Sequence, residues 1–157
     1  MDFDGDIDIT KLIRQGGIYK DVEGSTPAEI YKNVTQKMDL PEGITAEFVT
    51  SALIAREEVL STAVGNGIAL PHARSPIMKT DEDQRICIVY LKNPIDMKAP
   101  DERMVHVMFI LLTHNPQVHL EILSSLAGLF RSLQFRKALE DRADEATITN
   151  LIREIEN

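Results

Sequence analysis

The sequence predicts an α/β fold, a three-layer α/β/α sandwich built around a mixed β-sheet. Segments with helical periodicity alternate with short β-branched segments along the chain, which is typical of a sheet with helices packed on it. The segments at residues 85–91 and 104–113 are nearly continuous in apolar residues. Such runs are expected for central strands when helices cover both faces of the sheet.

The composition indicates one domain spanning residues 1–157. The chain is long enough to bury a core and has no repeat or linker-like tract. No apolar run is longer than residues 107–112, which are far fewer than the roughly 20 residues that a membrane span needs. The acidic N-terminus has no apolar signal-peptide core, and the single cysteine, Cys87, cannot form an internal disulfide, so we expect a cytoplasmic protein. A net charge of −8 argues against a nucleic-acid-binding surface.

The first half of the chain is expected to contribute one strand and two helices. Residues 1–16 are an N-terminal extension with a single helical turn before two glycines, and a strand follows at residues 18–22. Thr26, Pro27 and Glu29 have the order of a capping box, which predicts a helix as far as about residue 38. Thr45 is the predicted N-cap of a second helix, which ends near residues 56–58 and has on its apolar side Phe48, Val49, Leu53 and Ile54.

The second half adds two central strands and three helices. After a polar loop at residues 75–85, strands are predicted at residues 85–91 and 104–113. His106 interrupts the second strand near its start and is expected to be a satisfied or edge histidine. Asn115 and Pro116 are the predicted N-cap and first residue of a helix that continues to Phe130. Closing helices are predicted at residues 135–140 and 145–155, the second capped by Asp144.

The most informative stretch is Val64-Gly65-Asn66-Gly67-Ile68-Ala69-Leu70-Pro71-His72-Ala73-Arg74. Gly65 and Gly67 tolerate positive φ, so the turn can be tight and a ligand or partner can approach closely. Residues 68–70 predict a short buried strand. Pro71 has no amide donor and is expected to end that strand, which leaves His72 just beyond its carboxyl end. Ligands of α/β sheets bind at such ends, so His72 is the leading candidate for a functional residue.

Together with Glu57, this stretch resembles the signature of the enzyme IIA domains of the bacterial sugar phosphotransferase system (PTS), fructose/mannitol class or type 2. The pattern is an acidic or amide residue, six residues of any kind, an apolar residue, Gly or Ala, two of any kind, apolar, Ala, apolar, Pro, His and a small residue. Every position from Glu57 to Ala73 matches it. The class includes the nitrogen-regulatory enzyme IIA, whose Gly-Asn-Gly turn this chain shares. The resemblance implies an α/β/α sandwich from about residue 18 to the C-terminus, with His72 as the phosphorylated residue.

The resemblance also implies further site residues. Arg56 stands sixteen residues before His72, where the mannitol-type domain has a site arginine, and its guanidinium would offset phosphoryl charge. Without the resemblance, Arg56 would be interpreted as a cation that stabilises a helix C-terminus. His119 aligns with the family's second active-site histidine and lies near a helix N-terminus, which attracts phosphate. Thr62 is a supporting candidate through its hydroxyl, although loop hydroxyls usually bond local backbone. Asn66 is a second supporting candidate, at the position of a glutamate in the mannitol-type domain.

Phosphoryl transfer through histidine has clear chemical requirements. The acceptor must be an unprotonated ring nitrogen in line with the donor phosphorus, and the charge of the transferring group must be stabilised. Family members use Nε2, and the other ring nitrogen of His72 is expected to bond a backbone carbonyl. His72 is therefore the expected nucleophile, with His119 and Arg56 stabilising the phosphoryl group. No metal or other cofactor is required.

The resemblance implies a phosphotransferase component that accepts a phosphoryl group from an HPr-type phosphocarrier protein and passes it to an enzyme IIB for sugar uptake. The alternative is a nitrogen-regulatory enzyme IIA, whose phosphorylation state controls protein partners. The two share an active site and differ in the downstream partner, so both interpretations stay open. A zinc hydrolase using His72, His114 and His119 is disfavoured, because the chain has no His-Glu-x-x-His motif and the last two histidines do not share a helical face.

Overall fold

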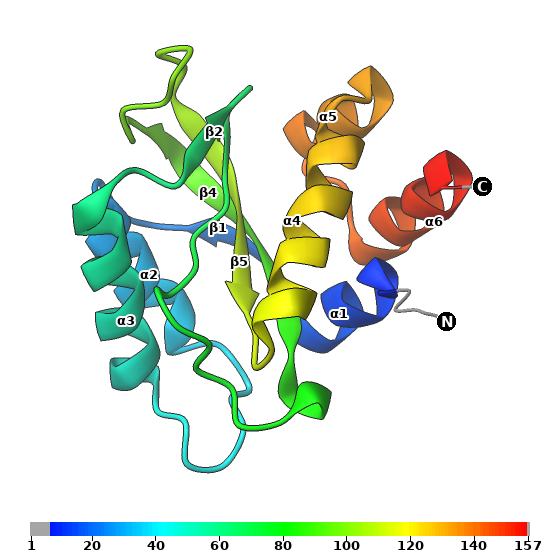
Figure 1. The fold of residues 1–157 in the computed structure, drawn as a ribbon. Helices are drawn as coiled ribbons and strands as arrows, with labels where there is room; N and C mark the ends of the chain where they lie inside the picture. The colour runs from blue at the N-terminus through cyan, green and yellow to red at the C-terminus, as the bar shows by residue number, and fades with distance from the viewer. Residues whose placement is uncertain (1–6, 157) are drawn as a thin grey trace.

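A mixed five-stranded sheet forms the centre of the protein (Figure 1). The computed structural model describes residues 7–156. The strands lie in the order β1-β4-β5-β3-β2, with β4 and β5 at the centre, β1 at one edge and β2 at the other. Their bounds are β1 Ile18–Val22, β2 Ala63–Gly65, β3 Ile68–Ala69, β4 Arg85–Ile95 and β5 Val105–Leu112. β1 runs parallel to β4 and β3 parallel to β5, whereas β4 and β5 are antiparallel, which confirms the predicted mixed sheet.

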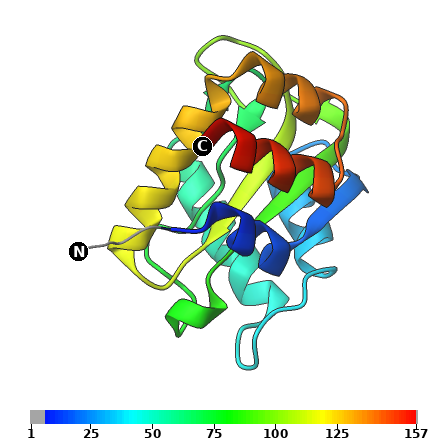
Figure 2. The same cartoon turned by 90° about the vertical axis from the view of Figure 1, so that its right-hand side faces the viewer.

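Helices cover both faces of this sheet, as the predicted α/β/α sandwich requires. α2 (Pro27–Thr35) and α3 (Ala46–Val59) lie on one face (Figure 1). Figure 2 shows the helices of the other face in front of the sheet, and they are α1 (Ile9–Gly16), α4 (Pro116–Phe130), α5 (Leu133–Glu140) and α6 (Glu145–Glu156). Among residues 7–156, no helix combines the length and apolar character needed to cross a membrane.

The sequence of β4 explains why the protein has two hydrophobic cores. Successive side chains of a strand point to opposite faces of the sheet. Those packed toward α2 and α3 are Cys87, Val89 and Leu91. Those packed toward α1 and the C-terminal helices are Ile86, Ile88 and Tyr90. All six are buried, so the strand has the nearly continuous apolar sequence of a two-sided core.

The predicted N-caps are confirmed. Thr26, Thr45, Asn115 and Asp144 each accept, through the side chain, a hydrogen bond from a backbone N–H in the first turn of the following helix. These short polar side chains satisfy amide donors that have no partner inside the helix. The cap at Asn115 fixes where the first turn of α4 begins, and it therefore sets the position of His119 in that turn.

Several boundaries differ from the prediction. α2 ends at Thr35 instead of near residue 38, and β4 continues to Ile95, which pairs with Val105 across an irregularity in the ladder. Phe48 does not join the apolar side of α3 and is 49% exposed. The strand β2 was not predicted; it forms a hairpin with β3 through Asn66 and Gly67, whose φ angles of 56° and 79° suit the two-residue turn of such a hairpin.

The extension at residues 1–16 contains a complete helix, α1, instead of the single turn expected. Asp8 caps it by accepting a hydrogen bond from the N–H of Lys11, and Ile9 and Ile13 are fully buried against the sheet. The acidic residues 1–6 lie outside the described residues. At Gly16 the backbone of α1 lies directly against the backbone of β4, because a Cβ added there would overlap the backbone carbonyl of Ile86.

We therefore expect Gly16→Ala to lower the free energy of unfolding by about 1–3 kcal/mol, since neither backbone can yield without disturbing α1 or β4. Urea denaturation measures this change. The matched control is Gly128→Ala within α4, where the nearest atom to an added Cβ, apart from the helix backbone and the adjacent residues, is Arg131 Nη2 at 3.8 Å. That variant should gain up to about 1 kcal/mol from helix propensity. Equal losses in both variants would contradict the close contact at Gly16.

Candidate functional site

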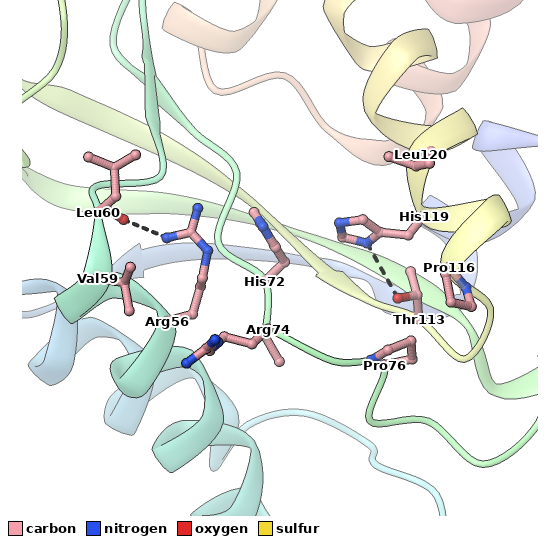
Figure 3. A pocket seen from close by; sticks show the side chains of 11 residues that line it. Arg56, Val59, Leu60, His72, Arg74, Pro76, Thr113, Pro116, His119 and Leu120 are labelled. Atoms are coloured by element: carbon pink, nitrogen blue, oxygen red, sulfur yellow. Dashed lines mark hydrogen bonds between the residues drawn. The ribbon is translucent and has the colours of Figure 1, made fainter.

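A cavity of about 550 Å³ opens between the C-terminal end of α3 and the N-terminal end of α4 (Figure 3). Three residues singled out in the sequence line it, namely Arg56, His72 and His119. They come from α3, from the segment after β3 and from the first turn of α4, so the fold brings together side chains that are far apart in sequence. The other lining residues are Val59, Leu60, Ala73, Arg74, Pro76, Thr113, Pro116 and Leu120.

Backbone bonds to β5 hold His72 at the floor of this cavity. The carbonyl of Pro71 accepts a hydrogen bond from the N–H of Leu111 at 2.9 Å, and His72 forms an isolated parallel bridge with Leu111. Pro71 has no N–H to extend the ladder, so the regular strand ends there. The side chain of His72, which follows it, points into the cavity. This is the position that the sequence predicted.

A backbone carbonyl two residues earlier in the chain holds the ring of His72. Nδ1 lies 2.7 Å from the carbonyl oxygen of Leu70. Because a carbonyl can only accept, Nδ1 must carry the proton, and Nε2 keeps its lone pair. The expected backbone partner is therefore the carbonyl of Leu70, and the nitrogen left free is the one that could attack an electrophile.

The imidazole of His119 faces that of His72 across the cavity (Figure 3). The two ring centroids are 4.9 Å apart and the ring planes are tilted by 56°. Nδ1 of His119 lies 3.4 Å from the hydroxyl oxygen of Thr113, at the end of β5. The ring thus stands at the N-terminal end of α4, where the helix dipole favours an anion over a second positive charge.

Both imidazoles are expected to be neutral near pH 7. Burial lowers the pKa of His72 below its ordinary value of 6.5, as does the nearby charge of Arg56, while the Leu70 carbonyl and Glu57 act in the opposite direction. Burial and the proximity of His72 lower the pKa of His119. A neutral ring offers an unprotonated nitrogen with a lone pair, which is the form that a nucleophile or a general base requires.

We expect an NMR titration to place the midpoint of each histidine below 6.5. The unfolded chain keeps ordinary histidine pKa values, so it takes up protons first as the pH falls. The contribution of these residues to the free energy of unfolding should accordingly be complete above pH 6.5 and decline as the pH falls through the lower, folded-state values. In His72→Asn the midpoint of His119 should rise. A wild-type midpoint at or above 6.5 would contradict the effect of burial.

Arg56 lies beside His72, and a second guanidinium lies close by. Nη1 of Arg56 donates to the carbonyl of Leu60 at 2.6 Å, which orients the side chain along the end of α3 (Figure 3). Arg74 also lines the cavity. Neither Arg74 nor Thr113 was assigned a role from the sequence. The signal for Arg74 was its place two residues after His72. Thr113 was marked by no motif, and it meets His119 because the chain turns from β5 into α4 between them.

Two supporting candidates lie outside the cavity. The hydroxyl of Thr62 is buried and donates to Glu57 Oε1 at 2.7 Å, so it does not point toward His72. Asn66 is at the tip of the β2–β3 hairpin, where its N–H donates to Asp101 Oδ2 at 2.8 Å. Neither residue lines the space around His72.

His114 also lies away from this space and contacts Asp81 through Nδ1 at 2.8 Å. In the part of the chain that the structure describes, no three His, Cys, Asp or Glu side chains form a group that could hold a metal ion.

The chain is similar in sequence to a known family and to several of its members. Residues 11–155 match the family model described as "Phosphoenolpyruvate-dependent sugar phosphotransferase system, EIIA 2". A nitrogen regulatory protein of Pseudomonas aeruginosa is 26% identical and is aligned over 96% of this chain and 98% of its own. A nitrogen regulatory protein homolog of Haemophilus influenzae is 32% identical, over 75% and 74%. The fructose-specific EIIABC component of Bacillus subtilis is 25% identical over 93% of this chain but only 23% of that longer protein.

Solved structures show the same fold. The crystal structure of nitrogen regulatory protein IIA-Ntr from Neisseria meningitidis has a TM-score of 0.77 and 26% identity, and the match covers 92% of this chain and 98% of that one. The IIA mannitol structure from Escherichia coli has a TM-score of 0.57 at 14% identity, covering 78% and 85%, and supports the fold alone. With the family model matching nearly the whole chain, this protein belongs to the EIIA type 2 family of the phosphoenolpyruvate-dependent sugar phosphotransferase system and is a phosphotransferase component with a phosphocarrier or regulatory role.

Proposed function

We propose that residues 1–157 act as one EIIA domain that carries a phosphoryl group on Nε2 of His72. The observation that carries this proposal is the hydrogen bond between Nδ1 of His72 and the carbonyl of Leu70, which leaves Nε2 unprotonated. A neutral imidazole facing a second histidine and an arginine, in an open cavity, suits the receipt of a phosphoryl group from another protein.

The proposed step exchanges one nitrogen–phosphorus bond for another. The Nε2 lone pair of His72 attacks the phosphorus of a phosphohistidine on an HPr-type carrier protein. A bond forms between Nε2 and phosphorus while the bond to the donor nitrogen breaks, and its electron pair returns to the donor ring. No proton has to move, since Nδ1 of His72 keeps its hydrogen and donates it in the hydrogen bond to the carbonyl of Leu70. The guanidinium of Arg56 and the ring of His119 stabilise the transferring oxygens.

The phosphoryl group on His72 must then be passed on or serve as a signal. Its delivery to an enzyme IIB for sugar uptake is the first candidate. It is supported by the similarity to a fructose-specific EIIABC component and by the match to the sugar EIIA family model. Control of protein partners is the second candidate. It is supported by the nitrogen regulatory proteins of Pseudomonas aeruginosa and Neisseria meningitidis, which this chain matches over 98% of their lengths.

The proposed function is tested by incubation with phosphoenolpyruvate, enzyme I and an HPr-type carrier, followed by intact mass measurement. We expect one added phosphoryl group that is lost in acid and survives in base, because a phosphoramidate is acid-labile. A folded protein that gains no mass from a cognate donor would overturn the proposal. Presenting the labelled protein to purified fructose-class enzyme IIB then separates the two branches, since rapid loss of the label supports the sugar branch and retention favours regulation.

A further inference from the structure

Glu57 is part of the sequence signature, yet it does not line the cavity and has no part in the proposed transfer step. It stands on the last turn of α3, next to Arg56. Its carboxylate accepts three hydrogen bonds. Oε1 accepts from the hydroxyl of Tyr31 at 2.6 Å and from the hydroxyl of Thr62 at 2.7 Å, and Oε2 accepts from the backbone N–H of Thr62 at 2.7 Å. An acidic side chain with three donors around it is held in a single position.

These bonds continue from Thr62 to the reactive histidine. The carbonyl of Thr62 accepts the N–H of Leu70 at 3.0 Å, and the carbonyl of Leu70 accepts Nδ1–H of His72 at 2.7 Å. Thr62 is 5% exposed and Leu70 is 7% exposed, so water has little access to compete for these groups. Glu57 is thus joined to the ring of His72 through two backbone segments.

The local sheet needs such an anchor. β2 has three residues and β3 has two, so the hairpin that positions Leu70 has few ladder bonds of its own. Pro71 cannot donate one. On one side the segment is tied to β5 through the carbonyl of Pro71 and the N–H of Leu111. On the other side, the bonds from Glu57 to Thr62 tie it to α3.

We propose that Glu57 is a positioning residue for His72, which acts through Thr62 to hold the carbonyl of Leu70 where it selects the tautomer with Nε2 free. The proposal rests on the proposed function, because only a reaction at Nε2 makes this tautomer important. An imidazole without a partner prefers the proton on Nε2, and in that form the nucleophilic lone pair is lost. Fixing the Leu70 carbonyl therefore raises the reactive fraction of the protein.

Hydrogen bonding can be separated from charge at this position. The negative charge of Glu57 favours the protonated form of His72 and opposes Arg56, so loss of charge alone changes the site. An amide lacks the charge, but its oxygen can still accept the N–H of Thr62 and its NH₂ group can meet a hydroxyl. Glu57→Gln therefore keeps the contact, whereas Glu57→Met keeps the length of the side chain and loses the acceptor. The matched control is Glu58→Met, because Glu58 is exposed and does not line the cavity.

The experiment measures two quantities for each variant. The first is the single-turnover rate of phosphoryl transfer from a phosphorylated HPr-type carrier, and the second is the tautomer of His72 from ¹⁵N NMR of the unphosphorylated protein. Glu57→Met should lose roughly 10- to 100-fold in rate, the usual effect of removing a partner that orients a functional histidine, and should show the Nε2–H tautomer. Glu57→Gln should keep the Nδ1–H tautomer and most of the rate, and Glu58→Met should match the wild type.

Two results would overturn the proposal. One is a Glu57→Met protein with wild-type tautomer and rate, and the other is an equal loss in the Gln and Met variants, which would assign the effect to charge. If Glu57→Met does not fold, Glu57→Asp serves the same purpose, because it keeps the charge but withdraws the carboxylate by one methylene; an unchanged tautomer there overturns the proposal. The tautomer is measured without a phosphoryl donor. If the wild-type protein accepts no phosphoryl group, the proposed function is wrong, and the tautomer measured by NMR still decides whether Glu57 positions His72.

Discussion

His72→Ala should abolish phosphoryl labelling by a phosphorylated HPr-type carrier. His72 offers the free Nε2 in the cavity, and the neighbouring imidazole of His119 has a different orienting contact, through Thr113 at 3.4 Å. Alanine removes the nucleophile without disturbing the anchor between Pro71 and Leu111, which is made by backbone atoms. Intact mass after incubation with the donor measures the result, and we expect no added phosphoryl group.

Two further histidine variants make this test specific. His119→Ala should still be labelled at a reduced rate, because in the proposed step His119 stabilises the phosphoryl group and does not carry it. His114→Ala should be labelled like the wild type, since His114 contacts Asp81 and does not line the cavity. A stable label on the His72→Ala protein would place the phosphorylated residue elsewhere, and sequencing of the labelled peptide would find it.

Arg56→Ala should lower the rate of phosphoryl transfer by about 10²–10³, the usual effect of removing one donor that stabilises developing charge in a sheltered site. The guanidinium lies at the cavity and is oriented by its bond to the Leu60 carbonyl. Because that bond is made at the surface end of α3, the free energy of unfolding should change little. Rapid-quench measurement of the labelled fraction gives the rate, and urea denaturation checks the fold.

The comparison between lysine and alanine at Arg56 tests the geometry of the interaction. Arg56→Lys keeps the charge but cannot bind two phosphoryl oxygens with a rigid pair of N–H groups, so we expect only partial recovery. Arg153→Ala, at an exposed position of α6, is the matched control and should transfer at the wild-type rate. Full activity in Arg56→Ala would show that the arginine only caps α3.

Local chemistry in the sequence was sufficient to predict much of the fold. The caps at Thr26, Thr45 and Asn115 depend only on neighbouring residues, and the two-sided apolar pattern of β4 reflects burial on both faces. His72 could be placed because Pro71 cannot extend a strand. The Asn66-Gly67 pair was also a strong local signal for a two-residue hairpin, and following it would have predicted β2.

The remaining details depend on side-chain directions that the folded chain sets. The hydroxyl of Thr62 does not reach His72, because it bonds Glu57, five residues earlier on the last turn of α3. Asn66 is six residues from His72 along an extended segment, so the hairpin carries it away from the cavity. Thr113 and His119 are six residues apart, and they meet because the chain turns from β5 into α4 between them. Side-chain direction in a loop is set by its tertiary neighbours, and the spacing of residues does not encode it.

The pairing of β1 with β4 has a consequence for how the chain folds as it is made. Ile18 lies opposite Ile88, and the ion pair between Asp21 and Arg142 joins residues 121 positions apart. A chain synthesised from its N-terminus therefore exposes the apolar side chains of α1 and β1 on the ribosome until β4 has emerged. The antiparallel β4–β5 pair, by contrast, joins strands that are neighbours in sequence and closes a much shorter loop. α1 and β1 are thus translated well before the segments that they pack against, and this delay is when the nascent chain most needs protection from aggregation.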